Sequence, residues 1–132
     1  MLIRFSKWHG TGNDFIMVDD RTGAFPFGDE GLIRRLCDRH FGIGSDGLIL
    51  IQAPQAGGTD FHMEFFNPDA SRSFCGNGSR CAFAFWSALN GRTEEARFTA
   101  IDGTHQGAWR GADVAVTLGP VPCVSQHDDH DF

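Results

Sequence analysis

Hydrophobic and polar positions alternate along much of this chain with the two-residue period of β-strands. The clearest alternation sets Phe61 and Met63 against His62 and Glu64, which is typical of a half-buried strand. The run 48–51 is apolar throughout and favours a short strand buried on both faces. With the turns between them, these patterns predict about seven strands, over residues 2–8, 13–19, 48–51, 59–66, 96–102, 105–110 and 113–119.

Two segments follow the helical period instead. The first covers residues 28–42, with Asp29 as its expected N-cap and Gly42 at its expected C-terminal end. The second runs from about residue 77 to residue 91 and is apolar nearly all round, as expected of a helix enclosed by a sheet. Together the elements predict an α+β domain in which a curved mixed β-sheet wraps around a central helix.

Length and charge narrow the class of protein. With 132 residues the chain has the size of one domain, and its net charge of −6 argues against a nucleic-acid binder. No apolar run approaches the ~20 residues of a membrane span, so we expect no membrane partner and a cytoplasmic location. We expect the domain to cover residues 1–119, with residues 120–132 forming a polar acidic tail or the start of an inter-domain linker.

The four cysteines are Cys37, Cys75, Cys81 and Cys123. Their spacing matches no recognised zinc pattern, so we expect no metal, and reduced thiols are favoured in a cytosolic domain of this size. Cys37 and Cys81 lie on the apolar faces of the two predicted helices, which indicates core packing.

Cys75 stands in a different setting, in the sequence SFCGNGSRC of residues 73–81. It precedes Gly76-Asn77-Gly78 at the start of the second predicted helix, where unpaired N–H groups and the helix dipole favour a thiolate. The two glycines leave main-chain N–H groups open to an anion such as a substrate carboxylate. The simpler alternative is that Cys75 is a small apolar side chain that begins the helix.

Three other polar turns, over residues 9–14, 42–47 and 67–71, could meet this one at one end of the sheet. Asn13 and Asn67 lie in two of them and carry amides that can bind both a carboxylate and an ammonium group, although turn asparagines often bond their own backbone. A thiol, a carboxylate cradle and flanking amides suit removal of the proton α to an amino-acid carboxylate.

No cofactor is expected from the motifs of this chain. The segment GIGSDG, residues 42–47, matches the spacing of a dinucleotide-binding loop. It precedes a predicted strand, whereas a dinucleotide-binding loop follows a strand and opens a helix, so dinucleotide binding is rejected.

Four blocks together carry a family resemblance: HGTGNDF, CDRHFGIGSDG, FFNPDAS and CGNGSRC. In this order they resemble the N-terminal half of diaminopimelate epimerase, over about residues 4–119. The resemblance implies one domain of a two-domain fold, in which two curved sheets, each around a central helix, face each other across a cleft. It also implies a cofactor-independent epimerase of lysine and peptidoglycan precursor synthesis, which interconverts LL- and meso-diaminopimelate with one cysteine from each domain.

Carried onto this sequence, the resemblance implies that Cys75 is one of the two catalytic thiols. Gly76 and Asn77 would bind the substrate carboxylate, and Asn13 and Asn67 would be further substrate contacts. Some family members have Gln where this chain has Gly47. The family's second half is absent from these 132 residues, so the chain is expected to be incomplete alone. A missing C-terminal domain or a second chain would supply the other thiol.

Other readings stay open. A homodimer could pair two Cys75 thiols across the cleft. A related isomerase of the same fold, such as a proline racemase or a phenazine-synthesis enzyme, could use a different substrate, and a non-catalytic amino-acid-binding fragment could use none. A redox pair of Cys75 and Cys81 is disfavoured, because six residues along one helix separate them too far for an unstrained disulfide.

Overall fold

The computed structural model describes residues 2–10, 12–117 and 129–131. The expected domain boundary at Gly119 and the cysteine at position 123 lie outside these residues. Residues 129–131 form a short strand, β8 (Asp129–Asp131), in a segment for which the sequence pattern predicted no strand. This strand pairs antiparallel with its neighbour β7.

The strands form one eight-stranded sheet whose spatial order is the order of the sequence. All neighbours are antiparallel except two parallel pairs, β2 with β3 and β4 with β5. Besides β8, its strands are β1 (Ser6–Gly10), β2 (Asn13–Asp19), β3 (Gly47–Gln52), β4 (Phe61–Phe66), β5 (Glu95–Ala100), β6 (Gly103–Arg110) and β7 (Asp113–Thr117). The sheet is therefore mixed, as predicted.

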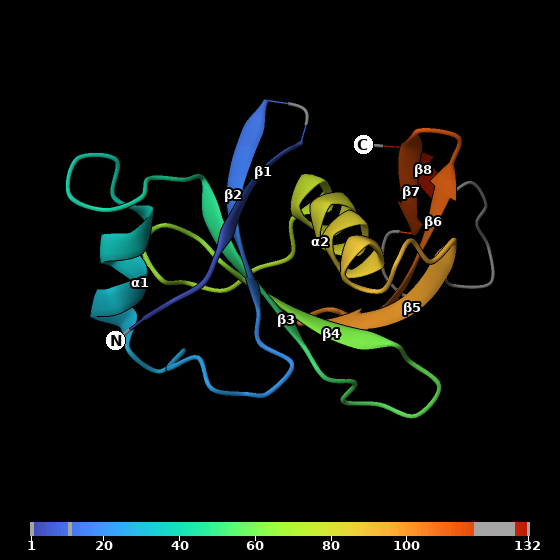
Figure 1. Cartoon of the computed structure of the whole chain (residues 1–132), viewed down its shortest axis with the longest axis horizontal. Coiled ribbons are helices and arrows are strands. Elements are labelled where there is room, and N and C mark those ends of the chain that lie inside the picture. Colours follow the sequence, from blue (N-terminus) through green and yellow to red (C-terminus); the bar gives the residue numbers. More distant parts are fainter. Residues whose placement is uncertain (1, 11, 118–128, 132) are drawn as a thin grey trace.

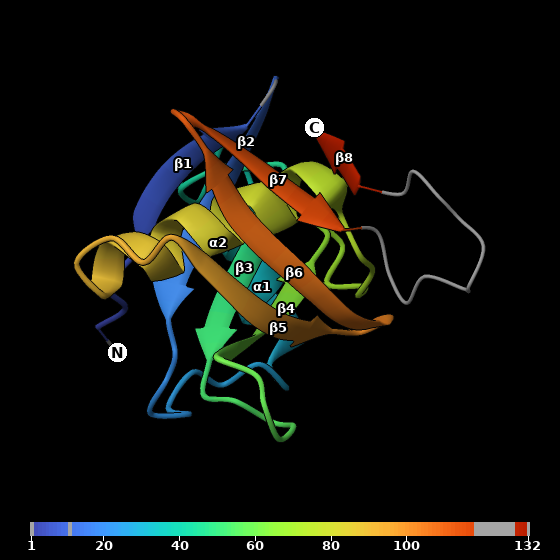
Figure 2. The ribbon, with the colours of Figure 1, turned by 90° about the vertical axis from the view of Figure 1, so that its right-hand side faces the viewer.

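The two helices are the crossovers that the parallel pairs require, because parallel neighbours cannot be joined by a tight hairpin. Helix α1 (Glu30–Cys37) connects β2 to β3 and lies outside the curled sheet, whereas α2 (Gly76–Leu89) connects β4 to β5 and lies in its hollow (Figures 1 and 2). The prediction of a curved sheet around a central helix is confirmed. Neither helix in the described ranges is long and apolar enough to cross a membrane.

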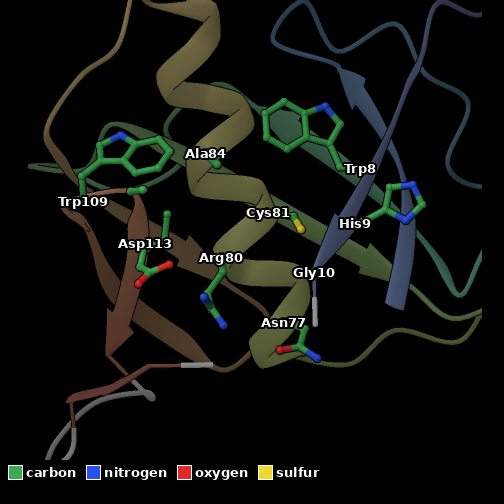
Figure 3. Close-up of a pocket in the computed structure, with 11 residues that line it drawn as sticks. Trp8, His9, Gly10, Asn77, Arg80, Cys81, Ala84, Trp109 and Asp113 are labelled. Atoms are coloured by element: carbon green, nitrogen blue, oxygen red, sulfur yellow. The ribbon is translucent and has the colours of Figure 1, made fainter. Parts of the chain in front are cut away.

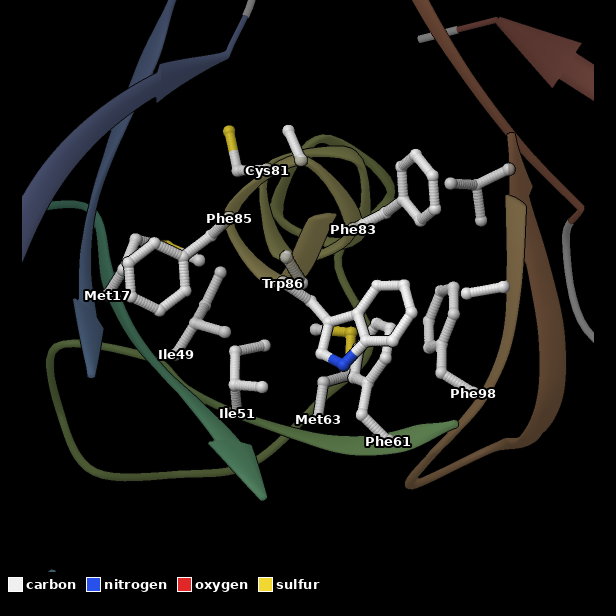
Figure 4. Close-up of a cluster of buried hydrophobic side chains, with 14 of the residues drawn as sticks. Met17, Ile49, Ile51, Phe61, Met63, Cys81, Phe83, Phe85, Trp86 and Phe98 are labelled. Carbon is white, nitrogen blue, oxygen red and sulfur yellow. The ribbon is translucent and has the colours of Figure 1, made fainter. Parts of the chain in front are cut away.

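The main core surrounds α2 (Figure 4). Phe83 and Ala82 of the helix are fully buried, and Trp86 stacks on Phe61 with ring centroids 5.2 Å apart. Phe61 in turn stacks on Phe98 of β5 at 4.8 Å. These contacts explain why α2 is apolar nearly all round: sheet residues meet it from several sides.

A second core fills the space between the sheet and α1. Ile33 and Cys37 of the helix pack against Leu48 and Leu50, while the alternate residue Ile49 faces the main core. Strand β3 is therefore buried on both faces, as its uninterrupted apolar run predicted.

Helix α1 is shorter than predicted. Its N-cap is Asp29, as expected, and the Asp29 carboxylate accepts a hydrogen bond from the Leu32 N–H at 3.0 Å. The helix ends at Cys37 and not near Gly42, because the Asp38 carboxylate accepts from the backbone N–H groups of the two residues 40 and 41. This local side-chain turn competes with the helical hydrogen bonds and turns the chain back toward α1.

Candidate functional site

Cys75 is the N-cap residue of α2, with an extended backbone (φ −126°, ψ 119°). Its Sγ accepts a hydrogen bond from the Gly78 N–H at 3.3 Å, and its carbonyl accepts from Ser79 N–H at 2.8 Å. The N–H groups of Gly76 and Asn77 have no partner among the described residues, as is usual in the first turn of a helix. The thiol is thus held beside two donors available to an anion.

The turns over residues 9–14 and 42–47 meet at this helix start, and the turn over residues 67–71 contacts the segment before it. Asn77 Nδ2 donates to Asn13 Oδ1 at 2.9 Å, which joins the start of α2 to the β1–β2 turn. Asn13 Nδ2 donates to Asp46 Oδ2 at 3.3 Å, which adds the turn before β3. Asn67 Nδ2 donates to Ser73 Oγ at 3.1 Å, which ties the turn after β4 to the segment that leads into Cys75.

Asn67 is also bonded within its own turn. Its amide nitrogen approaches the carbonyl and the hydroxyl of Ser71 at 3.2 and 3.1 Å. In the part of the chain that the structure describes, no hydrogen bond joins Asn67 to Asn13 or Asn77. The structure therefore brings Asn13, Asn77 and the Cys75 cap together directly, and connects Asn67 to them through Ser73.

A cluster of four charged side chains supports the Asn13 end of the site. Arg39 donates to both oxygens of Asp14, at 3.2 and 2.9 Å, and to Asp46 Oδ1 at 3.1 Å. Lys7 Nζ lies 3.0 Å from Asp14 Oδ2. The hydrogen bonds from the Arg39 guanidinium, and then those from Lys7 and the Asp46 N–H, hold the pKa of the Asp14 carboxyl well below its usual range.

This cluster predicts an acid-sensitive contribution to stability. Because its folded pKa is depressed, the Asp14 carboxylate stabilises the fold above its unfolded pKa of about 4, and this stabilisation is lost as the pH falls further. We expect Asp14→Asn to lower the free energy of unfolding by roughly 1–2 kcal/mol at pH 7. Below about pH 4, the free energy of unfolding of the variant should decrease less steeply with falling pH than that of the wild type.

Urea unfolding between pH 2 and 7 measures both effects. Asp19→Asn is the matched control, because Asp19 also pairs with an arginine, Arg21 at 2.8 Å, but both side chains are more than one-third exposed. An Asp14→Asn variant with the same pH dependence as the wild type would contradict the assigned role.

The three described cysteines, Cys37, Cys75 and Cys81, are free thiols. Cys37 and Cys81 are buried, as predicted, and burial raises the pKa of both thiols, that of Cys81 to about 11. Cys75 is only partly buried. Within the described ranges, no three His, Cys, Asp or Glu side chains are placed to hold a metal ion.

Alkylation should therefore be selective for Cys75. At pH 8 a thiol with a pKa near 11 is about 0.1% thiolate, and burial further hinders reagent access to Cys81. In a Cys123→Ser background, we expect iodoacetamide to label Cys75 at least about tenfold faster than Cys37 or Cys81. Peptide mass spectrometry measures the order of labelling, and Cys81 or Cys37 reacting first would contradict this expectation.

Two hollows flank the Asn13–Asn77 contact. One, of about 340 Å³, is lined by His9, Gly10, Gly12, Asn13, Asp14, Arg39 and Asp46. The other, of about 260 Å³, lies over α2 between β1 and the strands β6 and β7, and Asn77, Arg80 and Cys81 project toward it (Figure 3). Cys75 is not among the residues that line either hollow.

Gly47 has a structural reason to be glycine. A Cβ atom at this position would lie 2.4 Å from Cε1 and 2.7 Å from Cζ of Phe65. The Phe65 ring thus occupies the space that a larger side chain at position 47 would need.

We expect Gly47→Ala to lower the free energy of unfolding by about 2 kcal/mol, because the ring must shift in a packed core. In a Phe65→Leu background the same substitution should cost at least about 1 kcal/mol less, since the two sites are in contact. Urea denaturation of the four chains measures this coupling, and Gly28→Ala, which meets nothing within 4 Å, is the control. Equal costs in both backgrounds would contradict the assigned conflict.

Sequence reasoning did not single out Asp46, Asp14, Arg39 or Lys7. Asp14 and Asp46 lie in two of the polar turns that were expected near Cys75, but neither was expected to act itself. No local signal pointed to them, because their contact depends on the parallel register of β2 and β3. In that register Phe15 pairs with Gly47, and an aspartate directly precedes each of these two residues. That register places Asp14 beside Asp46, and each backbone N–H donates to the other residue's carboxylate at 3.1 Å.

Comparisons with known proteins agree on one family. The family model described as diaminopimelate epimerase matches residues 5–124. The diaminopimelate epimerase of Flavobacterium psychrophilum is 44% identical over 132 residues, which cover 98% of this chain and 51% of that relative. The diaminopimelate epimerase of Synechocystis sp. is 49% identical over 96 residues, which cover 72% of this chain and 34% of that relative.

Solved structures support the fold. A predicted epimerase from Pseudomonas aeruginosa matches with a TM-score of 0.59 at 16% identity. The match covers 87% of this chain and 42% of the Pseudomonas chain. A phenazine biosynthesis protein of the PhzF family from Bacillus anthracis matches with a TM-score of 0.57 at 12% identity. This match covers 87% of the present chain and 38% of the Bacillus chain. The chain spans about half the length of the Flavobacterium relative and about a third of the Synechocystis one. By its sequence matches, the chain belongs to the diaminopimelate epimerase family.

Proposed function

We propose that this chain is the N-terminal half of a diaminopimelate epimerase and that Cys75 is one of its two catalytic thiols. The observation that carries the proposal is the position of Cys75 as the N-cap of α2, beside the unpaired N–H groups of Gly76 and Asn77. A substrate carboxylate bound by these donors would bring its α-carbon near the thiol.

The proposed chemistry is a transfer of protons at one carbon. The Cys75 thiolate takes the α-proton, and the electron pair of the broken C–H bond moves toward the carboxylate, where the donors of Gly76 and Asn77 stabilise the charge. A thiol on the opposite face then gives a proton to the carbon, and inversion is complete. In the reverse direction, the two sulfur atoms exchange roles.

The second thiol must come from outside the described residues. Cys37 and Cys81 are buried. Cys81 packs closely against Gly10, because a Cβ atom added at Gly10 would lie 3.1 Å from the Cys81 Sγ. Together with the length of the relatives, this favours a missing C-terminal domain or second chain as its source. A homodimer with two Cys75 thiols remains a variant, and the molecular mass in solution separates it from a monomer.

Asn13 and Asn67 are proposed substrate contacts. The amide of Asn13 is already fixed by Asn77 and Asp46, and so would bind substrate without a further loss of side-chain entropy. The Asn67 side chain donates within its turn, while its oxygen accepts no hydrogen bond from the described residues. That oxygen could accept from the ammonium group of an amino acid.

Titration of the ¹⁵N-labelled chain with meso-diaminopimelate tests the proposed site. We expect the backbone signals of Gly76, Asn77 and Gly78 to shift with diaminopimelate and not with cadaverine, a diamine without carboxylates. The Cys75→Ser variant should keep this binding, because serine is also a good N-cap. Equal shifts with cadaverine, or none with diaminopimelate, would overturn the proposal; binding without proton exchange would indicate an amino-acid-binding fragment.

A further inference from the structure

We propose that Asp46 is a positioning residue that sets the orientation of the Asn13 amide and, through it, that of Asn77. The inference rests on the proposed function, because it concerns two amides of the same site. Asp46 reaches Asn77 only through Asn13: the contacts run from Asp46 Oδ2 to Asn13 Nδ2 and from Asn13 Oδ1 to Asn77 Nδ2.

The direction of this chain follows from the chemistry of a carboxylate. An ionised carboxylate can only accept hydrogen bonds, so the NH₂ group of Asn13 must face Asp46. The oxygen of Asn13 then faces Asn77, which must present its own NH₂ group at 2.9 Å. One acceptor at Asp46 therefore decides which end each of two amides turns outward.

The carboxylate of Asp46 is well anchored for this role. Its Oδ1 accepts from Arg39 at 3.1 Å, and its Oδ2 accepts from the Asp14 N–H at 3.1 Å as well as from Asn13. Its own N–H donates to the Asp14 carbonyl at 2.9 Å. Lys7 completes the support by contacting Asp14 and donating to the Gly44 carbonyl at 2.6 Å.

The consequence concerns binding of an anion. In the observed orientation, each amide retains one N–H that these two hydrogen bonds do not use. If Asp46 became an asparagine, it could donate as well as accept. The reversed order of both amides would then satisfy the contacts with Asn13 and Asn77, at the loss of the bond from the Asp14 N–H. Reversal would exchange the places of the NH₂ group and the oxygen on both amides. The free N–H groups would then no longer lie where the wild-type site holds them, which would weaken its affinity for a carboxylate.

The experiment compares the wild-type chain with Asp46→Asn, and with Asp19→Asn as the control for loss of an aspartate paired with arginine. Side-chain NH₂ signals of ¹⁵N-labelled protein are assigned by their loss in Asn13→Ala and Asn77→Ala. We expect Asp46→Asn to shift or double the NH₂ signals of both Asn13 and Asn77, and to weaken diaminopimelate binding about fivefold. Asp19→Asn should leave the signals and the affinity unchanged.

The Asn77 signal is the decisive one, because Asn77 does not contact Asp46 and a merely local structural role would not move it. An unchanged Asn77 signal in Asp46→Asn would overturn the inference, whatever happens to stability. An unchanged affinity for diaminopimelate, together with shifted NH₂ signals of Asn13 and Asn77, would also overturn it. If the wild type bound no diaminopimelate, the proposed function would fail, while the coupled amide signals would still support the orientation by Asp46.

Discussion

Replacing Gly42 with alanine is expected to lower the free energy of unfolding by about 3 kcal/mol, the high end of the usual cost of overpacking. A Cβ atom at Gly42 would lie 1.7 Å from the carbonyl oxygen of Arg35 and 2.8 Å from its carbon. Both atoms belong to the backbone of α1, so no rotation of a side chain can relieve the conflict. The loop or the end of the helix must move instead.

The displaced loop is the one that leads to the site. After Gly42, the N–H groups of Ile43 and Gly44 both donate to the Leu36 carbonyl, and Ser45 N–H donates to the Cys37 carbonyl at 3.1 Å. These bonds hold the chain against the end of α1 just before it reaches Asp46. We therefore expect Gly42→Ala to disturb the side-chain amide signal of Asn13 as well as the stability.

Urea unfolding and the ¹⁵N spectrum measure the two effects. Gly57→Ala is the matched control, because a Cβ there would meet nothing within 4 Å, and its free energy of unfolding should change by less than about 0.5 kcal/mol. If Gly42→Ala were as stable as this control, the close packing of the loop against α1 would be refuted.

The elements with a strong local pattern were predictable from the sequence. Helix α2 was expected over residues 77–91 and extends over Gly76–Leu89, because its apolar residues and its flanking turn glycines agree. The buried strand β3 was predicted for the same reason. The end of α1 was not, because the Asp38 side chain bonds the backbone two and three residues ahead and stops the helix before the glycine.

The candidate site also has one part that was predictable from the sequence and another that was not. The position of Cys75 at the helix start depends on neighbouring residues and was predictable. The role of Asp46 depends on the parallel register of β2 and β3, which sets Phe15 beside Gly47 across a separation of 32 residues. No local pattern reports such a register. The hollow between β1 and β7 likewise depends on how far the sheet curls around α2 (Figure 3).

The second large effect is expected at Cys75. If its thiolate is the base, Cys75→Ala and Cys75→Ser should lower the exchange of the diaminopimelate α-proton with solvent by at least about 100-fold. Serine is the sharper substitution, because its hydroxyl can also accept the Gly78 N–H and begin the helix, but it is far less acidic than a thiol. A loss of exchange in a fully folded Cys75→Ser chain therefore reports chemistry and not unfolding.

Cys123→Ser is the matched control for removal of a thiol and should retain the exchange. Stereochemical analysis of the same samples separates a half-site from a complete one. Exchange without inversion is expected of a single thiol acting on one face. Inversion that persists in Cys123→Ser would mean that a second chain brings its own thiol to the substrate.

The most direct test of the central claim is ¹H NMR of meso-diaminopimelate incubated in D₂O with the wild-type chain and with Cys75→Ser. The account predicts that deuterium enters at the α-carbon with the wild type and is lost with the serine variant. Exchange that persists in Cys75→Ser, or none with a wild-type chain that binds diaminopimelate, would contradict the assignment of Cys75 as the base.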